Sequence, residues 1–332
     1  MTPSDIVMEK IARTLGRGGF GMRIFVTGAS GWIGSAVVPE LLGAGHEVVG
    51  LARSEASARR LEAAGAVVHH GDLDDPEGLG KAAADSDGVI HLAFQHEVAF
   101  GAGDFARAAA VDRRAVEAMG GALAGSDRPF VLASGTLGVN PAGLATEDCG
   151  LVPSADARAT PIGLRAATAL LALSFRGTGL RPSVLRLPPT VHGDGDQGFV
   201  AGLVDIARQR GVAGYVGDGT NRWPAVHRSD AARLARLAVE AAPAGSVLHA
   251  IGDEGVALRD IAEVIGRRLG LSTASVAPAA ASEHFGHLGL LVGLDSPASA
   301  RRTRELLGWE PTGPSLLEDL DQDHYYRRPA AR

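Results

Sequence analysis

The sequence predicts an α/β fold in which a doubly wound parallel sheet is followed by a smaller C-terminal lobe. Ile24-Phe-Val26 is a short apolar run of the kind that forms buried parallel strands. Glycines and a helical pattern follow it, and strand-like runs then alternate with helical patterns to about residue 192. With 332 residues, 45% of them hydrophobic, the chain can bury a large core and carry a second lobe.

Composition excludes several classes of protein. The net charge of −6 gives no electrostatic reason to expect nucleic acid or an anionic membrane as a partner. The single cysteine, Cys149, cannot form an internal disulfide or a cysteine-rich metal site, so we expect a reducing, cytoplasmic location. No apolar run reaches about 18 residues without a charge or a breaker, so we expect no membrane span.

Residues 1–21 stand apart as an N-terminal extension. Ile6, Val7, Ile11 and Leu15 lie at spacings that would line one side of a short helix, and a glycine-rich joint follows. A secretory signal is not expected, because there is no long apolar core or small-residue cleavage site. Two interpretations stay open: a loosely ordered extension, or a helix that docks on the domain or on a partner subunit.

The segment between the first strand and the first helix reads Thr27-Gly-Ala-Ser-Gly-Trp-Ile-Gly34. The first glycine allows a tight turn, the second lets the backbone approach a pyrophosphate, and the third lets helix and strand pack closely. Free N–H groups at the start of the helix would hold the diphosphate. The segment therefore predicts a dinucleotide-binding turn. The expected contacts are Gly28, Ser30, Gly31, Trp32, Ile33 and Gly34.

This glycine spacing resembles that of the short-chain dehydrogenase/reductase superfamily, since ordinary Rossmann dehydrogenases have their first two glycines closer together. Its place at the head of the chain resembles the extended branch, the NAD(P)-dependent epimerase/dehydratase-like proteins, over about residues 22–327. The resemblance implies a Rossmann-type NAD(P)-binding domain at residues 22–192. It also implies that residues 193–332 form mainly a substrate-binding lobe, with some elements returning to the Rossmann sheet.

The end of the second expected strand bears on the choice of cofactor. An acid there would favour NAD, whereas an arginine favours the 2′-phosphate of NADP. Arg53 and Ser54 stand at this point and no acid does, so NADP(H) is preferred and NAD(H) is the alternative. Arg53 could instead be a solvated residue at the entry of a helix. The resemblance adds three adenosine contacts: Asp72 for the adenine amine, Leu73 beside the ring and Ala93 beside the ribose.

Candidate catalytic residues follow three expected strands. The strand at 129–133 leads to Ser134 and Thr136, and the resemblance implies that one of them hydrogen-bonds the substrate oxygen. After the strand at 88–94, Gln95 and His96 are expected substrate contacts, with His96 also a candidate proton donor. The segment 188–193 resembles the one that meets the nicotinamide. Its residues Pro188 and Val191 would contact the cofactor, and His192 would replace a frequent tyrosine.

The sequence departs from the family where Tyr-x-x-x-Lys is expected, because Ile162 and Ala166 stand there instead. None of the three tyrosines has a lysine four residues later. Arg165 could take over the role of the lysine in holding the cofactor. The proton could come from His96, His192 or Tyr215, or an already protonated imine could need no acid. A last alternative is that the protein catalyses no reaction and binds the cofactor only to sense it.

The C-terminal lobe offers further substrate candidates. Tyr215 is one, and Arg222 matches a residue that often meets a sugar-nucleotide phosphate in extended members. Trp223 could floor a pocket or belong to the core. The apolar segment 281–294 could be a lid or a homodimer contact. Its histidines lack a third ligand apart from Glu283, so we expect no metal.

Together these features predict an NADP(H)-dependent oxidoreductase that reduces a small or medium carbonyl or imine without the usual dyad. Two alternatives remain: a non-catalytic NADP(H)-binding sensor, and an enzyme of the sugar-nucleotide epimerase or dehydratase type. The second alternative is weaker because those reactions depend on the missing tyrosine.

Overall fold

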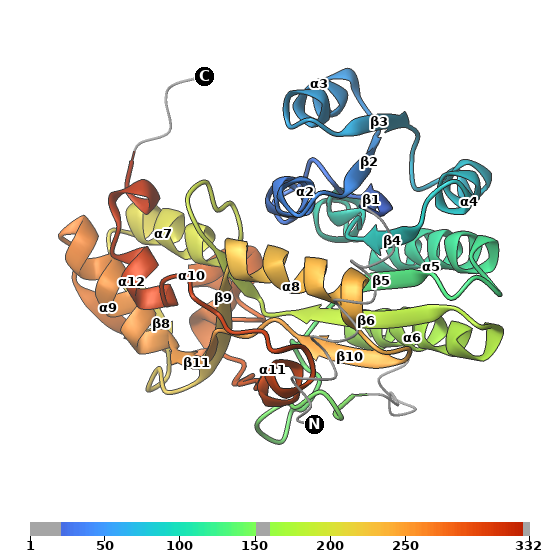
Figure 1. Ribbon diagram of the computed structural model, residues 1–332. Coiled ribbons are helices and arrows are strands. Elements are labelled where there is room, and N and C mark those ends of the chain that lie inside the picture. Colours follow the sequence, from blue (N-terminus) through green and yellow to red (C-terminus); the bar gives the residue numbers. More distant parts are fainter. Residues whose placement is uncertain (1–20, 151–159, 328–332) are drawn as a thin grey trace.

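The computed structural model describes residues 21–150 and 160–327 (Figure 1). Its centre is a seven-stranded sheet in the order β10-β6-β5-β4-β1-β2-β3. All six neighbouring pairs run parallel, which confirms the predicted α/β class. The strands are β1 (Arg23–Thr27), β2 (Glu47–Ala52), β3 (Val67–His70), β4 (Gly88–His91), β5 (Pro129–Gly135), β6 (Arg181–Leu187) and β10 (Ser246–His249).

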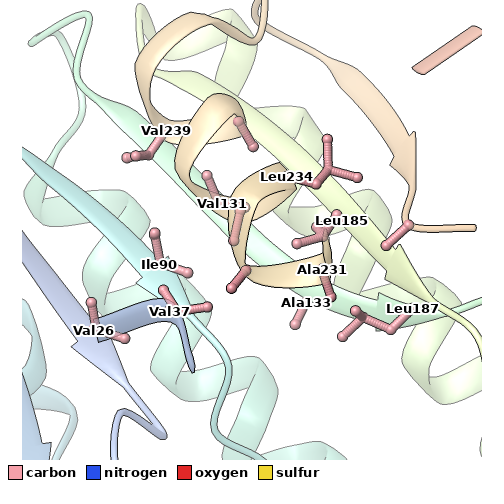
Figure 2. Packing of buried hydrophobic residues seen from close by; sticks show 14 of the residues in the cluster. Val26, Val37, Ile90, Val131, Ala133, Leu185, Leu187, Ala231, Leu234 and Val239 are labelled. Atoms are coloured by element: carbon pink, nitrogen blue, oxygen red, sulfur yellow. The ribbon is translucent and has the colours of Figure 1, made fainter. Parts of the chain in front are cut away.

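Helices cover both faces of this sheet. One face packs against α2 (Gly34–Gly43), α3 (Glu55–Ala63) and α8 (Arg228–Ala241), and the other against α4 (Pro76–Ala84), α5 (Phe105–Ala122) and α6 (Pro161–Ser174). Successive residues of a strand point to opposite faces of the sheet, so an apolar strand contributes side chains to the hydrophobic core on each face. In β1, Val26 joins the core beneath α2 and α8, and Phe25 joins the core beneath α4 and α5. Figure 2 shows Leu234 and Val239 of α8 packed over Val131 of β5.

The C-terminal lobe is built on two small sheets, one ordered β11-β9-β7 and one pairing β12 with β8. Its buried cluster includes Trp223, Phe285 and Leu316. The chain leaves the lobe through α8 to add β10 to the central sheet and then returns, as Figure 1 shows. The elements are β7 (Thr190–His192), α7 (Phe199–Arg210), β8 (Ala213–Val216), β9 (Arg222–His227), β11 (Asp253–Ala257), α9 (Leu258–Leu269), β12 (Thr273–Val276), α10 (Ala281–Phe285), α11 (Arg301–Leu307) and α12 (Leu316–Leu320).

Several expectations need adjustment or stay open. The fifth strand runs on through Ser134 to Gly135, and Tyr215 lies in strand β8. The segment 281–294 begins with the short helix α10, and its role as a lid or dimer contact stays a prediction. Residues 1–20 of the predicted extension lie outside the described residues. Among the helices described, none has the length and apolar character needed to cross a bilayer.

Candidate active site

The glycine turn between β1 and α2 leaves room only for glycine at two positions. Gly28 has φ +66°, and a Cβ there would lie 2.8 Å from the Ala93 nitrogen. A Cβ on Gly34 would lie 2.1 Å from the Gly28 oxygen, so helix and strand could not pack as closely. The start of α2 has no side-chain cap and no acid in its first turn. The Ser35, Ala36 and Val37 amides are bonded to carbonyls of the turn. The Ile33 and Gly34 amides make no hydrogen bond within the described residues, so they can meet an anion and the turn fits a dinucleotide diphosphate.

Two of the predicted cofactor residues meet across 159 positions of sequence. The indole Nε1–H of Trp32 donates to the Val191 carbonyl at 2.8 Å. This bond joins the glycine turn to β7, and Pro188 lies just ahead of that strand. The turn and the segment expected at the nicotinamide are thus held together at one edge of the sheet.

At the adenosine end, the Arg53 side chain is 63% exposed and forms an ion pair with Glu97 at 3.3 Å. Glu97 opens the π-helical turn η1 (Glu97–Gly101) that follows β4. The Ser54 hydroxyl is committed to capping α3, since it accepts from the Ser57 amide. Ser54 is therefore better explained as a cap than as a phosphate ligand.

Two of the three adenosine contacts implied by the resemblance follow β3. The Asp72 carboxylate accepts a hydrogen bond from the Asp74 amide at 3.0 Å, which fixes the bend after the strand. Leu73 is buried in the core beneath α4 and α5. Both residues lie just past the carboxyl end of β3, and their roles as adenosine contacts stay predictions.

A buried chain of hydrogen bonds runs beneath this edge of the sheet. The Thr27 hydroxyl lies 2.6 Å from His91 Nδ1, and His91 Nε2 lies 3.1 Å from the Asp112 carboxylate. The Ala93 amide donates to the Thr27 hydroxyl at 3.2 Å. An ionised carboxylate only accepts, so the pattern assigns the His91 proton to Nε2 and the Thr27 proton to the bond with Nδ1.

The chain of hydrogen bonds continues from the Asp112 carboxylate to Arg165, where it ends. Burial would raise the pKa of Asp112, but the charge of Arg165 and the His91 bond outweigh it and lower that pKa below its usual value. Arg165 donates from Nη1 to Asp112 at 2.6 Å and from Nη2 to the Ala133 carbonyl at 2.7 Å. Its guanidinium also lies over the Phe94 ring, with Cζ 4.6 Å from the centroid. Its side chain remains 22% exposed, so the cation is fixed in place yet reaches the surface.

The two candidate hydroxyls at the carboxyl end of β5 differ in accessibility. Thr136 is fully buried, and its amide and hydroxyl both point to the Leu187 carbonyl, at 3.0 and 3.5 Å. This corrects the assignment of Thr136, whose hydroxyl is enclosed by the fold. Ser134 is partly exposed and follows Ala133, the carbonyl partner of Arg165. Within residues 21–150 and 160–327 its side chain makes no hydrogen bond, so Ser134 stays the candidate for the substrate hydrogen bond.

His96 packs beside the same aromatic ring as Arg165. Its imidazole meets Phe94 edge-on with centroids 5.2 Å apart, and its Nδ1 lies 3.1 Å from the Phe94 carbonyl. Loss of solvent lowers the pKa of His96, the carbonyl opposes the shift, and the positive charge of Arg165 lowers it further. Gln95 donates to Asp74 at 2.8 Å, and its own carbonyl oxygen is buried without a partner in the described structure.

The His192 side chain is not accessible at the carboxyl edge of the sheet. It is fully buried, and its Nδ1 lies 2.9 Å from Asp319 of α12. Its Nε2 is buried without a partner among the described residues. The expectation of a catalytic His192 is therefore corrected, because the C-terminal lobe closes over it.

The remaining substrate candidates belong to the C-terminal lobe. Arg222 is bound to Asp295 through Nε at 3.1 Å and Nη2 at 2.9 Å, so its fork already has a carboxylate partner. Trp223 is fully buried in the lobe core, which favours the core alternative for this residue. The Tyr215 ring lies beneath the Arg259 guanidinium, with its centroid 5.2 Å from Arg259 Cζ.

An open depression of about 550 Å³ also lies on this lobe. Its lining comes from the lobe alone, so it is separate from the edge where Ser134 and Arg165 lie. The lining residues are Val216, Asp218, Thr220, Asn221, Arg222, Gly293 and Asp295. In the described part of the chain, no three histidine, cysteine or acidic side chains are grouped to hold a metal ion.

Sequence reasoning missed Asp112. The signal was present: an acid lies on the buried face of α5, among Ala108, Val111 and Ala115. A charged group at such a position needs a partner. The identity of that partner depends on how α5 and α6 pack, which the local pattern does not contain.

Comparison with known proteins decides the family. Residues 24–250 match the NAD dependent epimerase/dehydratase family. The chain belongs to this family. Its relatives include an uncharacterized protein of Schizosaccharomyces pombe, 45% identical over 92% of this chain and 100% of that protein. The 2-alkyl-3-oxoalkanoate reductase of Stenotrophomonas maltophilia is 32% identical over 68% of this chain and 67% of that protein.

A solved structure gives the same fold. The dTDP-glucose 4,6-dehydratase DesIV of Streptomyces venezuelae, determined with NAD bound, aligns with a TM-score of 0.73. The alignment covers 92% of this chain and 97% of that chain at 22% identity. Family membership confirms the resemblance drawn from the glycine spacing, and makes this chain an NAD(P)-dependent enzyme.

Proposed function

We propose that this enzyme is an NADP(H)-dependent reductase of a small or medium carbonyl or imine that works without the Tyr-x-x-x-Lys pair. One observation carries the proposal. Arg165 is fixed by Asp112 and the Ala133 carbonyl, and the next residue along the strand, Ser134, has a hydroxyl without a hydrogen bond among the described residues. A fixed cation and a free hydroxyl at the carboxyl edge of one strand suit a bound cofactor and a polar substrate oxygen.

Arg165 takes the role of the missing lysine in holding the cofactor. Two of its guanidinium N–H groups are used by Asp112 and Ala133, and a guanidinium carries five. The remaining donors are available to ribose hydroxyls. The cofactor, when bound, supplies the hydride. Ser134 donates a hydrogen bond to the substrate oxygen and so orients the reacting carbon.

His96 is the candidate proton source. Its lowered pKa leaves the imidazole mostly neutral at neutral pH. A carbonyl substrate that draws its proton from His96 would then react faster in mildly acidic solution. A protonated imine carries its own proton and would not need this residue.

The preference for NADP(H) rests on Arg53. A 2′-phosphate can replace Glu97 as the partner of Arg53, because an exposed ion pair contributes at most about 1 kcal/mol. A phosphate carries more charge than a carboxylate and accepts the guanidinium fork as two parallel bonds.

Two observations favour reduction over sugar-nucleotide chemistry. Arg222, the residue expected to meet a sugar-nucleotide phosphate, is already paired with Asp295. A relative that shares two thirds of its length with this chain carries the name of a ketone reductase. The substrate is therefore proposed to be a small molecule without a nucleotide.

The test combines binding with turnover. NADPH and NADH are titrated by fluorescence, and cofactor absorbance is then followed with a panel of carbonyls and imines. We expect tighter NADPH binding, turnover of at least one substrate, and loss of most turnover in Ser134→Ala. Ser246→Ala, which removes a remote hydroxyl bonded to the Pro243 carbonyl, is the matched control. Tight binding without turnover across the panel would favour the cofactor-sensing alternative.

A further inference from the structure

One arginine near the glycine turn forms no ion pair in the described part of the chain. Arg228 opens α8, and its guanidinium lies over the Trp32 indole with Cζ 4.2 Å from the ring centroid. Within residues 21–150 and 160–327 this guanidinium donates no hydrogen bond and forms no ion pair. Two turns further along the same helix, Arg236 binds both Glu40 and Glu240. Arg228 is thus a cation held by stacking alone.

The indole that holds Arg228 belongs to the glycine turn. Trp32 lies two residues before α2 begins at Gly34, and its Nε1–H bond to Val191 fixes the ring. Arg228 is therefore kept beside the end of the glycine turn, where the Ile33 and Gly34 amides, unbonded within the described residues, suit a diphosphate. A guanidinium stacked on an aromatic ring keeps its N–H edge free for another partner.

The start of α8 lies at the same edge of the sheet. The helix connects β9 to β10, and β10 is parallel to its neighbour β6, so α8 runs back from the carboxyl edge. It packs beside α2 in one hydrophobic core. The positive ends of two helices and an arginine thus converge there. Asp230 is the acid in the first turn of α8. Its carboxylate accepts hydrogen bonds from the Thr312 and Gly313 amides.

We propose that Arg228 is a cofactor-binding residue that pairs with the diphosphate of NAD(P)(H). The inference rests on the proposed function only in requiring that cofactor to occupy the glycine turn. An arginine without an ion pair among the described residues, held beside the glycine turn, favours an anion there, and the diphosphate is the anion that the turn is shaped to receive. Arg228 therefore serves both cofactors alike, whereas Arg53 would serve only the 2′-phosphate.

The experiment measures equilibrium binding of NADPH, NADH and ADP-ribose to the full chain carrying Arg228→Ala. ADP-ribose contains the diphosphate but no nicotinamide and no 2′-phosphate. A lost charge-assisted pair should weaken all three ligands by roughly 10- to 100-fold. Arg228→Lys keeps the charge without the planar fork and should lose less. Arg267→Ala, which removes an exposed arginine paired with Asp321, is the control and should change nothing.

The outcomes separate this inference from the proposed function. Weakened ADP-ribose binding supports the role of Arg228 even if no substrate is turned over. Unchanged affinity for all three ligands, in a variant whose melting temperature matches the parent, overturns it. Unchanged cofactor binding with a raised KM for acidic substrates also overturns it, since Arg228 would then meet a substrate anion.

Discussion

Arg165 of α6 donates to the carboxylate of Asp112 on α5 at 2.6 Å, and Asp112 is itself 1% exposed. Neither residue is part of the usual dyad, yet the pair fixes a cation beside the carboxyl end of β5. The Asp112 carboxylate is also bonded to His91, which in turn is bonded to Thr27 just before the glycine turn. A single hydrogen-bond chain therefore links the diphosphate turn to the cation proposed to hold the ribose.

We predict that Asp112→Asn lowers the free energy of unfolding by roughly 3 kcal/mol, because removing one partner leaves a partly buried charge uncompensated. The asparagine carbonyl can still accept from His91, but its amide faces Arg165 as a second donor. Urea unfolding measures the loss, and adding Arg165→Gln should recover part of it. A loss in the double variant equal to the sum of the two single-variant losses would show that the two side chains are not coupled.

The same pair predicts a pH dependence of stability. The folded pKa of Asp112 is below its ordinary value of 3.8, so its contribution is present above that value. The contribution is lost as pH falls through the lower folded pKa. Acid unfolding of Asp112→Asn should therefore be shallower than that of the parent below about pH 4. Parallel acid transitions in the two proteins would contradict this.

We predict that Glu97→Gln strengthens NADPH binding by about two- to fivefold and leaves NADH unchanged, because it removes the carboxylate that competes for Arg53. Arg53→Ala should have the opposite selectivity and weaken NADPH at least tenfold more than NADH. Fluorescence titration measures both effects. Equal changes for the two cofactors would rule out a 2′-phosphate contact at Arg53.

We predict that Gly34→Ala destabilises the fold by about 1 to 3 kcal/mol and weakens both cofactors, since its Cβ would overlap the Gly28 carbonyl. Gly43→Ala, at the other end of α2, is the matched control because no atom lies within 4 Å of the added Cβ. That change should stabilise the helix slightly. Thermal unfolding compares the two, and equal melting temperatures would argue against the close packing of helix and strand.

We predict that ketone reduction accelerates as pH falls through a His96 pKa below 6.5, and that His96→Ala removes this rise. The lowered pKa sets the sign, because the imidazolium that donates the proton is populated only below it. Rates at saturating NADPH between about pH 5 and pH 8 provide the measurement. A pH profile that is identical in the variant would exclude His96 as the donor.

The sequence by itself determined the elements whose signals are local. The apolar run at 24–26, the glycines at 28, 31 and 34 and the helix after them each depend on neighbours in the chain, so the first strand, the turn and the α/β class could be predicted. The absence of Tyr-x-x-x-Lys could also be read directly, since it concerns residue types at a fixed spacing.

Only the tertiary structure decided which side chains meet and which are enclosed. Arg165 and Asp112 are 53 positions apart, Trp32 and Val191 are 159 apart, and His192 and Asp319 are 127 apart. Hydrophobic periodicity specifies which face of an element is buried, but not which polar group on another element lies opposite. For that reason the sequence named Thr136, His192 and Trp223 as candidates, and the packing of the sheet and of the C-terminal lobe enclosed all three. The same packing brought Arg228 onto Trp32, because α8 returns from the lobe to lie beside α2.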